Sequence, residues 1–286
     1  MSSSPNSGVE LRAGALRLAL RPDLGGSIAG LWHHTEPLMR CTEPAELASA
    51  RLSACFPLVP YSNRLGFRRF RWQGGDYTTV ANFGDSPHSL HGAAWMRPWE
   101  VISSTDTEAV LRYSHTPDEH WPFAFEVRQT FALTPQQLTL RFAFTNTGNI
   151  AQPVGLGWHP YFPAHTQSQL DIEVTDKWET DEVLLPTRKV PQRGIASLVS
   201  QLDVDNCFEG WSGLARIRDE RFALELKSSL PYLVVFTPRD KGYFCVEPVS
   251  HVNDAIHMAD PARHGLRSVE TGQSTDAWMT LDIAPL

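Results

Sequence analysis

The sequence predicts an all-β protein, a large antiparallel β-sandwich with very little helix. Apolar and polar residues alternate with a period of two in many short segments, as in strands with one buried face. The 21 prolines are scattered along 286 residues, which suits many loops joining many strands. Only the stretch from Pro44 to Leu52 has a helical pattern, with proline near its first turn.

The best-defined strands form a predicted hairpin in the middle of the chain. Apolar residues occupy every second position from Phe123 to Val127, a segment that leads toward Phe131. The same alternation returns from Leu138 to Phe144, after a polar turn at residues 134–137. A period of two on both sides of a turn is the pattern of an antiparallel pair.

Shorter segments with the same alternation predict further strands at residues 16–20, 110–113, 222–226, 233–236 and 279–283. No repeat of about 20–50 residues is present, and no low-complexity linker divides the chain, so residues 9–286 are expected to form one domain. Residues 1–8 lack the basic segment and long apolar run of a secretory signal. They are expected to form a disordered tail.

Composition restricts the classes of partner. Lys and Arg total 25 against 32 Asp and Glu, a formal net charge of −7, which argues against nucleic acid or an anionic membrane surface. No apolar run reaches the roughly 20 residues of a membrane span. The four cysteines have no metal-binding or disulfide-framework spacing, so they are expected to be buried reduced thiols in a cytoplasmic protein. The sequence leaves a monomer or a homodimer open.

Two ionisable residues stand inside apolar, aromatic segments, each followed by proline. His159 lies between Trp158 and Pro160, and Glu247 ends an apolar run before Pro248. A charged group on an apolar face must be paired, shifted in pKa or used in chemistry. An acid and a base in such surroundings are suited to proton transfer at a sugar ring.

Three more polar segments interrupt the strand pattern: Asn63-Arg64, His91-Gly92 and the Asp205 segment. Each has an ordinary structural explanation. Arg64 is explained as a surface cation, His91 as a turn residue, and Asp205 with the following asparagine as a turn. Likewise, His159 is explained as a satisfied core histidine and Glu247 as the partner of an arginine inside the sandwich.

Together these segments resemble the aldose 1-epimerase (galactose mutarotase) family. The family order is Asn-Arg, a Phe-x-Trp/Phe-x-Gly strand, His-Gly, His-x-Tyr-Phe, an acidic segment and a late Glu. The chain offers these in that order as Asn63-Arg64, Phe70 to Gly74, His91-Gly92, His159 to Phe162, Asp205 and Glu247. The likeness runs from about Arg17 to the last strand. Val246-Glu247-Pro248-Val249 departs from the Leu-Glu-Thr-Gln of the galactose-type branch and is more similar to a less characterised bacterial branch.

The resemblance implies a mutarotase that interconverts the α and β anomers of a monosaccharide without a metal or cofactor. It implies Glu247 as the base and His159 as the acid, with Asn63, Arg64, His91 and Asp205 binding substrate. On physical grounds we expect a raised pKa for Glu247 in an apolar cleft, and a favoured charged form for His159 beside carboxylates. Trp158, Tyr161 and Phe208 are explained either as a sugar-stacking surface or as ordinary core.

The sequence leaves three alternative functions open. A hexose 6-phosphate epimerase would need additional cations, and Arg68, Arg69 and Arg71 form a basic run, although strand alternation favours a solvated strand. A non-catalytic carbohydrate-binding protein would not need both Glu247 and His159. A glycoside hydrolase would use two carboxylates, with Asp205 and Glu247 as the candidates.

A metal centre is not favoured by the sequence. His88-x-x-His91 has a spacing that suits two metal ligands, but no carboxylate-rich motif accompanies it.

Overall fold

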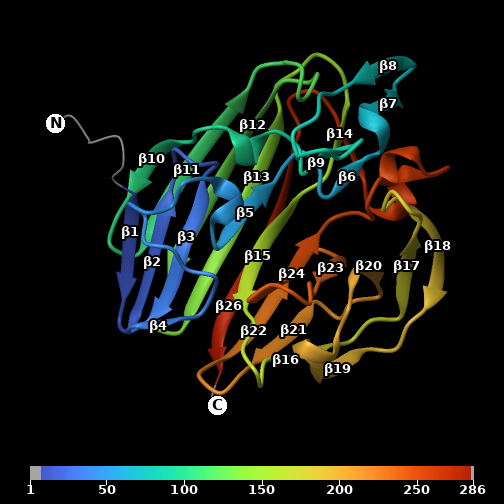
Figure 1. Cartoon of the computed structure of the whole chain (residues 1–286). Helices are drawn as coiled ribbons and strands as arrows, with labels where there is room; N and C mark the ends of the chain where they lie inside the picture. Colours follow the sequence, from blue (N-terminus) through green and yellow to red (C-terminus); the bar gives the residue numbers. More distant parts are fainter. Residues whose placement is uncertain (1–7, 285–286) are drawn as a thin grey trace.

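The computed structural model describes residues 8–284 and contains two large antiparallel sheets, of 11 and 9 strands. Figure 1 shows them as stacked layers, with β1–β3 (blue) in front of β12 and β13 (green). The predicted all-β sandwich is therefore confirmed. Residues 1–7 of the predicted tail lie outside the described residues, and Gly8 is partly buried directly before β1.

The first sheet has the order β1-β2-β3-β5-β15-β24-β23-β20-β17-β18, with β4 paired to β3. Its strands are β1 (Val9–Ala13), β2 (Leu16–Arg21), β3 (Ser27–His33), β4 (Glu36–Pro37), β5 (Cys55–Leu58), β15 (Gly157–Pro163), β24 (Tyr243–Val249), β23 (Tyr232–Phe236), β20 (Asp205–Glu209), β17 (Asp176–Thr180) and β18 (Pro186–Pro191).

The second sheet has the order β10-β11-β12-β13-β26-β22-β21-β16-β19. Its strands are β10 (Glu100–Ser104), β11 (Glu108–His115), β12 (Phe125–Leu133), β13 (Gln137–Asn146), β26 (Ser274–Ala284), β22 (Ala223–Ser228), β21 (Leu214–Arg218), β16 (Gln169–Ile172) and β19 (Ile195–Leu198).

Three two-stranded ladders and six short 3-10 turns connect the sheets within residues 8–284. The ladders are β6 (Arg64–Leu65) with β9 (Ser89–Leu90), β7 (Arg69–Trp72) with β8 (Gly75–Thr78), and β14 (Gln152–Val154) with β25 (Arg267–Val269). The 3-10 turns are η1 (Ala50–Leu52), η2 (Gly66–Arg68), η3 (Ala94–Met96), η4 (Val199–Gln201), η5 (Ala255–His257) and η6 (Pro261–His264). None of the helical segments in the described range is long and apolar enough to span a bilayer.

The predicted hairpin is β12 with β13, paired from Phe125–Asn146 to Leu133–Leu138. The other predicted strands are present too, and several are longer than their apolar cores, as in β11. The predicted helix at Pro44–Leu52 is wrong, because only η1 at its end is helical. The Arg21 guanidinium donates to the carbonyl oxygens of Pro44 and Leu47, which a regular helix would use for its own hydrogen bonds.

The first sheet is buried on both faces near its centre. Trp158, Phe162 and Phe244 point into the large core between the sheets. Tyr161 and Cys245 belong to a second apolar cluster on the opposite face, because successive side chains of a strand alternate in direction. Loops and short turns cover that outer face, and the candidate site lies on it.

All four cysteines are free thiols, three buried and Cys41 partly buried. This agrees with the reduced thiols predicted from their spacing.

Candidate active site

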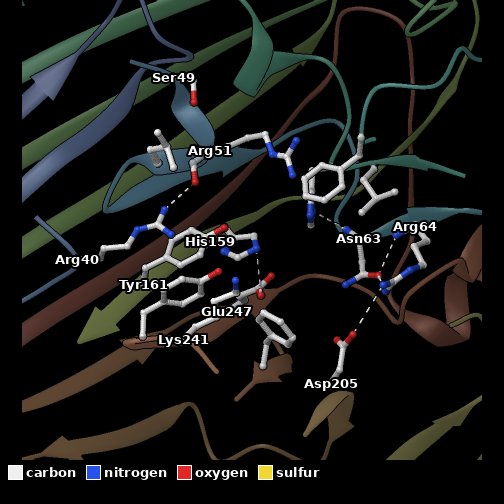
Figure 2. Close-up of a pocket in the computed structure, with 16 residues that line it drawn as sticks. Arg40, Ser49, Arg51, Asn63, Arg64, His159, Tyr161, Asp205, Lys241 and Glu247 are labelled. Carbon is white, nitrogen blue, oxygen red and sulfur yellow. Dashed lines mark hydrogen bonds and ion pairs between the residues drawn. The ribbon is translucent and has the colours of Figure 1, made fainter. Parts of the chain in front are cut away.

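The centre of the site is a pair of residues on neighbouring strands, β15 and β24. The register that pairs Tyr161 with Cys245 places His159 opposite Glu247, although almost ninety positions separate them in the sequence. Opposite residues of an antiparallel pair point to the same face. His159 and Glu247 therefore both point to the outer face of the first sheet, where Figure 2 shows them directed toward each other.

Both strands carry a proline immediately after the ionisable residue. Proline has no N–H to donate to a ladder and is uncommon in central strands. Pro160 and Pro248 coincide with a gap in the β15–β24 ladder, which has no paired residues between Gly157–Val249 and Tyr161–Cys245. The sheet stays continuous, since β5 still pairs with Pro160 and β23 with Pro248.

The pair is buried and only partly satisfied by protein atoms. His159 Nε2 lies 3.4 Å from Glu247 Oε1, and the two residues are 7% and 2% exposed. His159 Nδ1 and Glu247 Oε2 have no hydrogen-bond partner among the described residues. Buried polar atoms are normally paired, so these two atoms are exceptions within the described residues.

The two pKa values shift in opposite directions. Burial raises the pKa of Glu247 well above its usual value, and the Asp205 charge adds to this while Arg64 opposes it. Burial also lowers the pKa of His159 well below its usual value, reinforced by His91 and Arg40. The expectation of a favoured charged form for His159 is therefore wrong, because loss of hydration outweighs the nearby carboxylate.

These shifts favour the neutral forms of both groups, with the shared proton on Glu247. The proton resides on Glu247 when both groups are neutral, or on His159 when they form an ion pair. Either arrangement provides one acid and one base, and they interconvert by a single proton transfer. The pair can consequently exchange the roles of donor and acceptor without help from solvent.

Asn63 and Arg64 meet His91 because β6 pairs with β9, which brings Arg64 opposite Leu90. Asn63 adopts a left-handed backbone with φ of 58°, and its Oδ1 accepts from Arg64 Nη1 at 2.9 Å. Asn63 thereby orients the Arg64 guanidinium, which lies in the cleft lining. The Asn-Arg segment works as one unit.

His91 is buried with a fixed tautomer. Its Nδ1 accepts a hydrogen bond from the Asn63 backbone N–H at 3.1 Å, so in the neutral ring the proton is on Nε2. Burial, helped by the charges of Arg64 and Arg51, lowers its pKa to about 3. His91 is therefore a neutral hydrogen-bond donor at physiological pH. Its ring contacts that of His159 edge to face, with centroids 5.2 Å apart.

Asp205 lies at the start of β20, opposite Phe236 of β23. Its Oδ2 lies 3.7 Å from Arg64 Nη2, a long ion pair (Figure 2). Burial raises the pKa of Asp205, and the Arg64 charge opposes this shift. All six residues selected from the sequence, Asn63, Arg64, His91, His159, Asp205 and Glu247, line one open cleft with a volume of about 670 Å³.

The three candidate stacking aromatics separate into two groups. Trp158 and Phe208 are almost fully buried in the core between the sheets, so they do not face the cleft. Tyr161 lines the cleft and stacks on His159, with ring centroids 4.5 Å apart and an interplanar angle of 13°. Phe83 and Phe236 also line it and were not selected from the sequence.

The cleft contains cations that sequence patterns did not reveal. Arg40, Arg51 and Lys241 line it, and each comes from a connection or a short turn with no strand pattern. The basic run Arg68, Arg69 and Arg71 is exposed and lies outside the cleft lining. The exposed arginines confirm the interpretation of that run as a solvated strand.

One group of possible metal ligands coincides with the site. Donor atoms of His159, Cys245 and Glu247 lie within 4.8 Å of one another. Burial raises the Cys245 pKa well above its usual value, which disfavours the thiolate that a metal would require. His88 does not join His91, because its Nδ1 accepts from the Phe67 backbone and its Nε2 faces the Val183 carbonyl oxygen at 2.9 Å.

Comparisons with known proteins agree with this architecture. The aldose 1-epimerase family model matches residues 8–282. YphB, an uncharacterised protein of Escherichia coli (strain K12), is 34% identical over 290 residues, covering 96% of this chain and 97% of YphB.

Solved structures give the same result. A crystal structure from Escherichia coli K12, described provisionally as an aldose 1-epimerase, has a TM-score of 0.88 at 32% identity, covering 98% of this chain and 99% of that one. A galactose mutarotase-like protein from Clostridium acetobutylicum has a TM-score of 0.86 at 18% identity, covering 97% and 95%, a likeness of fold alone. With the family model matching nearly the whole described chain, this protein belongs to the aldose 1-epimerase family.

Proposed function

We propose that this protein is a mutarotase that interconverts the α and β anomers of a monosaccharide, with Glu247 as the base and His159 as the acid. The observation that supports this most directly is the 3.4 Å approach of His159 Nε2 to Glu247 Oε1 in an open cleft. The pair thus offers both halves of an acid–base reaction to one ring.

The proposed reaction begins from the ion pair, after the proton has moved to His159 from Glu247, where the two pKa shifts favour it. Glu247 accepts the proton of the C1 hydroxyl, the bond between C1 and the ring oxygen breaks, and His159 protonates the ring oxygen. The product is an open-chain aldehyde, and Glu247 now carries the proton. Rotation about C1–C2 exposes the other face of the carbonyl. Ring closure then returns the proton from Glu247 to the new C1 hydroxyl oxygen, while His159 accepts the proton of the attacking hydroxyl.

The surrounding residues have proposed roles that follow from their hydrogen-bonding capacity. Arg64 and the Nε2–H of His91 donate to sugar oxygens, and they stabilise negative charge that develops on the ring oxygen. The Arg64 charge also favours the ionised form of Glu247, which is the form that acts as base. Asp205 accepts hydrogen bonds from one or two sugar hydroxyls. Asn63 contributes by orienting Arg64.

The proposed location is the cytoplasm, supported by four cysteines that are all free thiols.

Polarimetry of freshly dissolved α-sugars tests the proposed function. Wild type should equilibrate at least one sugar faster than buffer. Glu247→Gln and His159→Asn should each lower kcat by about 10²–10⁴-fold, because positioned acid–base groups contribute about that much. Glu108→Gln, an exposed carboxylate of β11 outside the cleft, is the matched control and should retain the wild-type rate.

Two outcomes would contradict the proposal. One is that no sugar in the panel equilibrates faster than buffer, although circular dichroism shows folded protein. The other is that both catalytic variants match wild type. Sugar binding that persists in Glu247→Gln while turnover is lost would support catalysis and argue against a protein that only binds carbohydrate.

A further inference from the structure

The cleft has a charge balance unlike that of the whole chain. Four cationic side chains line it, from Arg40, Arg51, Arg64 and Lys241, against the two carboxylates of Asp205 and Glu247. The chain as a whole carries a formal net charge of −7. A local excess of cations in an acidic protein attracts anions selectively to that place.

Only one of these cations has an acidic partner. Arg64 pairs with Asp205 at 3.7 Å. Within residues 8–284, no carboxylate oxygen lies within 4.0 Å of Arg40, Arg51 or Lys241. We call these three residues the cation rim.

Arg40 is the most firmly held member of the cation rim. Its Nη2 donates to the Arg51 carbonyl oxygen at 2.7 Å, and its Nε to the Ser53 carbonyl oxygen at 3.1 Å. The guanidinium carbon also lies 3.5 Å from the centroid of the Tyr161 ring and 4.8 Å from that of Tyr243. This leaves Nη1 without a partner among the described residues, on a cation whose position is already fixed.

The other two members are long and exposed. Arg51 belongs to η1 and packs its guanidinium on the Phe83 ring, 3.9 Å from the centroid. Lys241 belongs to the connection between β23 and β24. In Figure 2, Arg40 and Lys241 lie on the side of Glu247 opposite to Asp205. Arg40 and Lys241 therefore leave unpaired cations on the side of the cleft opposite Asp205, while the Arg51 guanidinium lies over Phe83.

We propose that the substrate is an aldose with an anionic substituent, a phosphate or a carboxylate, that binds to the cation rim while C1 lies at His159 and Glu247. This inference rests on the proposed mutarotase function and adds the chemical class of its substrate. Guanidinium and ammonium groups form charge-assisted hydrogen bonds with such oxyanions. The cations involved are different from the exposed run of Arg68, Arg69 and Arg71.

The first experiment compares three sugars that differ only at C6. Anomer exchange of glucose, glucose 6-phosphate and glucuronate is measured by NMR saturation transfer, at low and at high salt. At least one of the two anionic sugars should have a kcat/KM at least ten-fold above that of glucose. That advantage should shrink as salt screens the cation rim. The phosphate and carboxylate sugars distinguish the two kinds of anion.

The second experiment alters the cation rim. Arg51→Gln and Lys241→Gln should each reduce the preference for the anionic sugar over glucose by about five-fold, the effect of an exposed ionic contact. The double variant should abolish most of it, through a higher KM for the anionic sugar. Arg71→Gln, an exposed arginine of β7 outside the cleft, should keep the wild-type preference.

Titration calorimetry of wild type with the same three sugars makes the two proposals separable. If no sugar is turned over but an anionic one binds more tightly than glucose, the mutarotase function fails and the ligand class stands. If glucose is bound and equilibrated as well as either anionic sugar, the inference is overturned and the mutarotase function stands. A preference as large in the double variant as in wild type also overturns it.

Discussion

Glu247 occupies a position where an apolar residue would stabilise the protein more. It is 2% exposed on a central strand, and its Oε2 has no partner among the described residues. Burying an ionisable group costs free energy unless it is paired or neutralised. Residues that lower stability but serve a reaction are common at functional sites. The proposed role of Glu247 as the base would explain its position, and the burial of its carboxyl group gives a stability prediction.

Glu247→Gln should stabilise the fold in a pH-dependent way. The folded-state pKa of Glu247 is raised above its usual value near 4.5, so unfolding releases the proton more easily. Wild type therefore loses stability as pH rises above about 4.5, and the loss grows until the folded-state carboxyl ionises. The variant avoids this loss, so its free energy of unfolding at pH 8 should exceed that of wild type by about 1–2 kcal/mol.

Urea unfolding at pH 5 and at pH 8 measures the effect. The difference between wild type and Glu247→Gln should be larger at pH 8. Glu108→Gln, with an exposed side chain, should show no such dependence on pH. A variant less stable than wild type at both pH values would contradict the prediction, because it would show that the buried carboxyl group stabilises the fold.

The short β6–β9 ladder and the turn after it hold Asn63, Arg64 and His91, which we propose bind substrate. Gly92 follows His91, has φ of +69°, and forms a bridge with Val59. A Cβ at this position would lie 2.2 Å from the Val59 carbonyl oxygen, a backbone atom that cannot move away by itself. Glycine is required here for conformation and for space.

Gly92→Ala should therefore damage both stability and activity. The positive φ alone costs about 1–2 kcal/mol in an L-residue, and the clash adds to it while displacing His91. Gly74→Ala is the matched control, since Gly74 has φ of +80° with no atom within 4 Å of its Cβ position. Thermal melts and polarimetry should show a small loss of stability with normal turnover for Gly74→Ala. Equal effects of the two variants would show that the Val59 contact is unimportant.

Elements with local patterns could be predicted from the sequence, and those set by distant contacts could not. The β12–β13 hairpin follows from alternation on both sides of a turn, and the structure pairs these two strands. The helix at 44–52 failed because Arg21, on a distant strand, takes two of its carbonyl oxygens. His159 and Glu247 could be selected by their apolar neighbours, but their adjacency depends on the pairing of β15 with β24.

The cations of the cleft could not be predicted from the sequence either, because their meeting also depends on distant contacts. Arg40, Arg51 and Lys241 lie in connections without periodicity, and only the tertiary fold brings them to one place. The lowered pKa of His159 was also missed, because the sequence shows the carboxylate nearby but not the extent of burial.

At the scale of the whole molecule, the first sheet carries the site on its outer face and packs its inner face against the core between the two sheets. Trp158 precedes His159 and points the other way, into that core. Its ring stacks on Phe142 of β13 in the second sheet, with centroids 4.3 Å apart and an interplanar angle of 4°. The second sheet thus contacts the strand that carries His159. Because one core joins both sheets, we propose that residues 9–286 fold as a single cooperative unit.

Phe142→Ala tests this connection. Removing a buried phenylalanine should cost about 3–5 kcal/mol in unfolding free energy, because the cavity cannot fully collapse. Loss of the stack should also loosen Trp158 and misplace His159, so kcat should fall at temperatures where the variant is still folded. Phe131→Ala is the control for stability alone, since Phe131 is equally buried in β12 but has no aromatic contact with β15. It should lose similar stability and keep its turnover. Circular dichroism and tryptophan fluorescence should report coincident unfolding for both variants, and two separate transitions would contradict a single cooperative unit. Normal turnover in Phe142→Ala would show that the stack of Phe142 on Trp158 does not help to position His159.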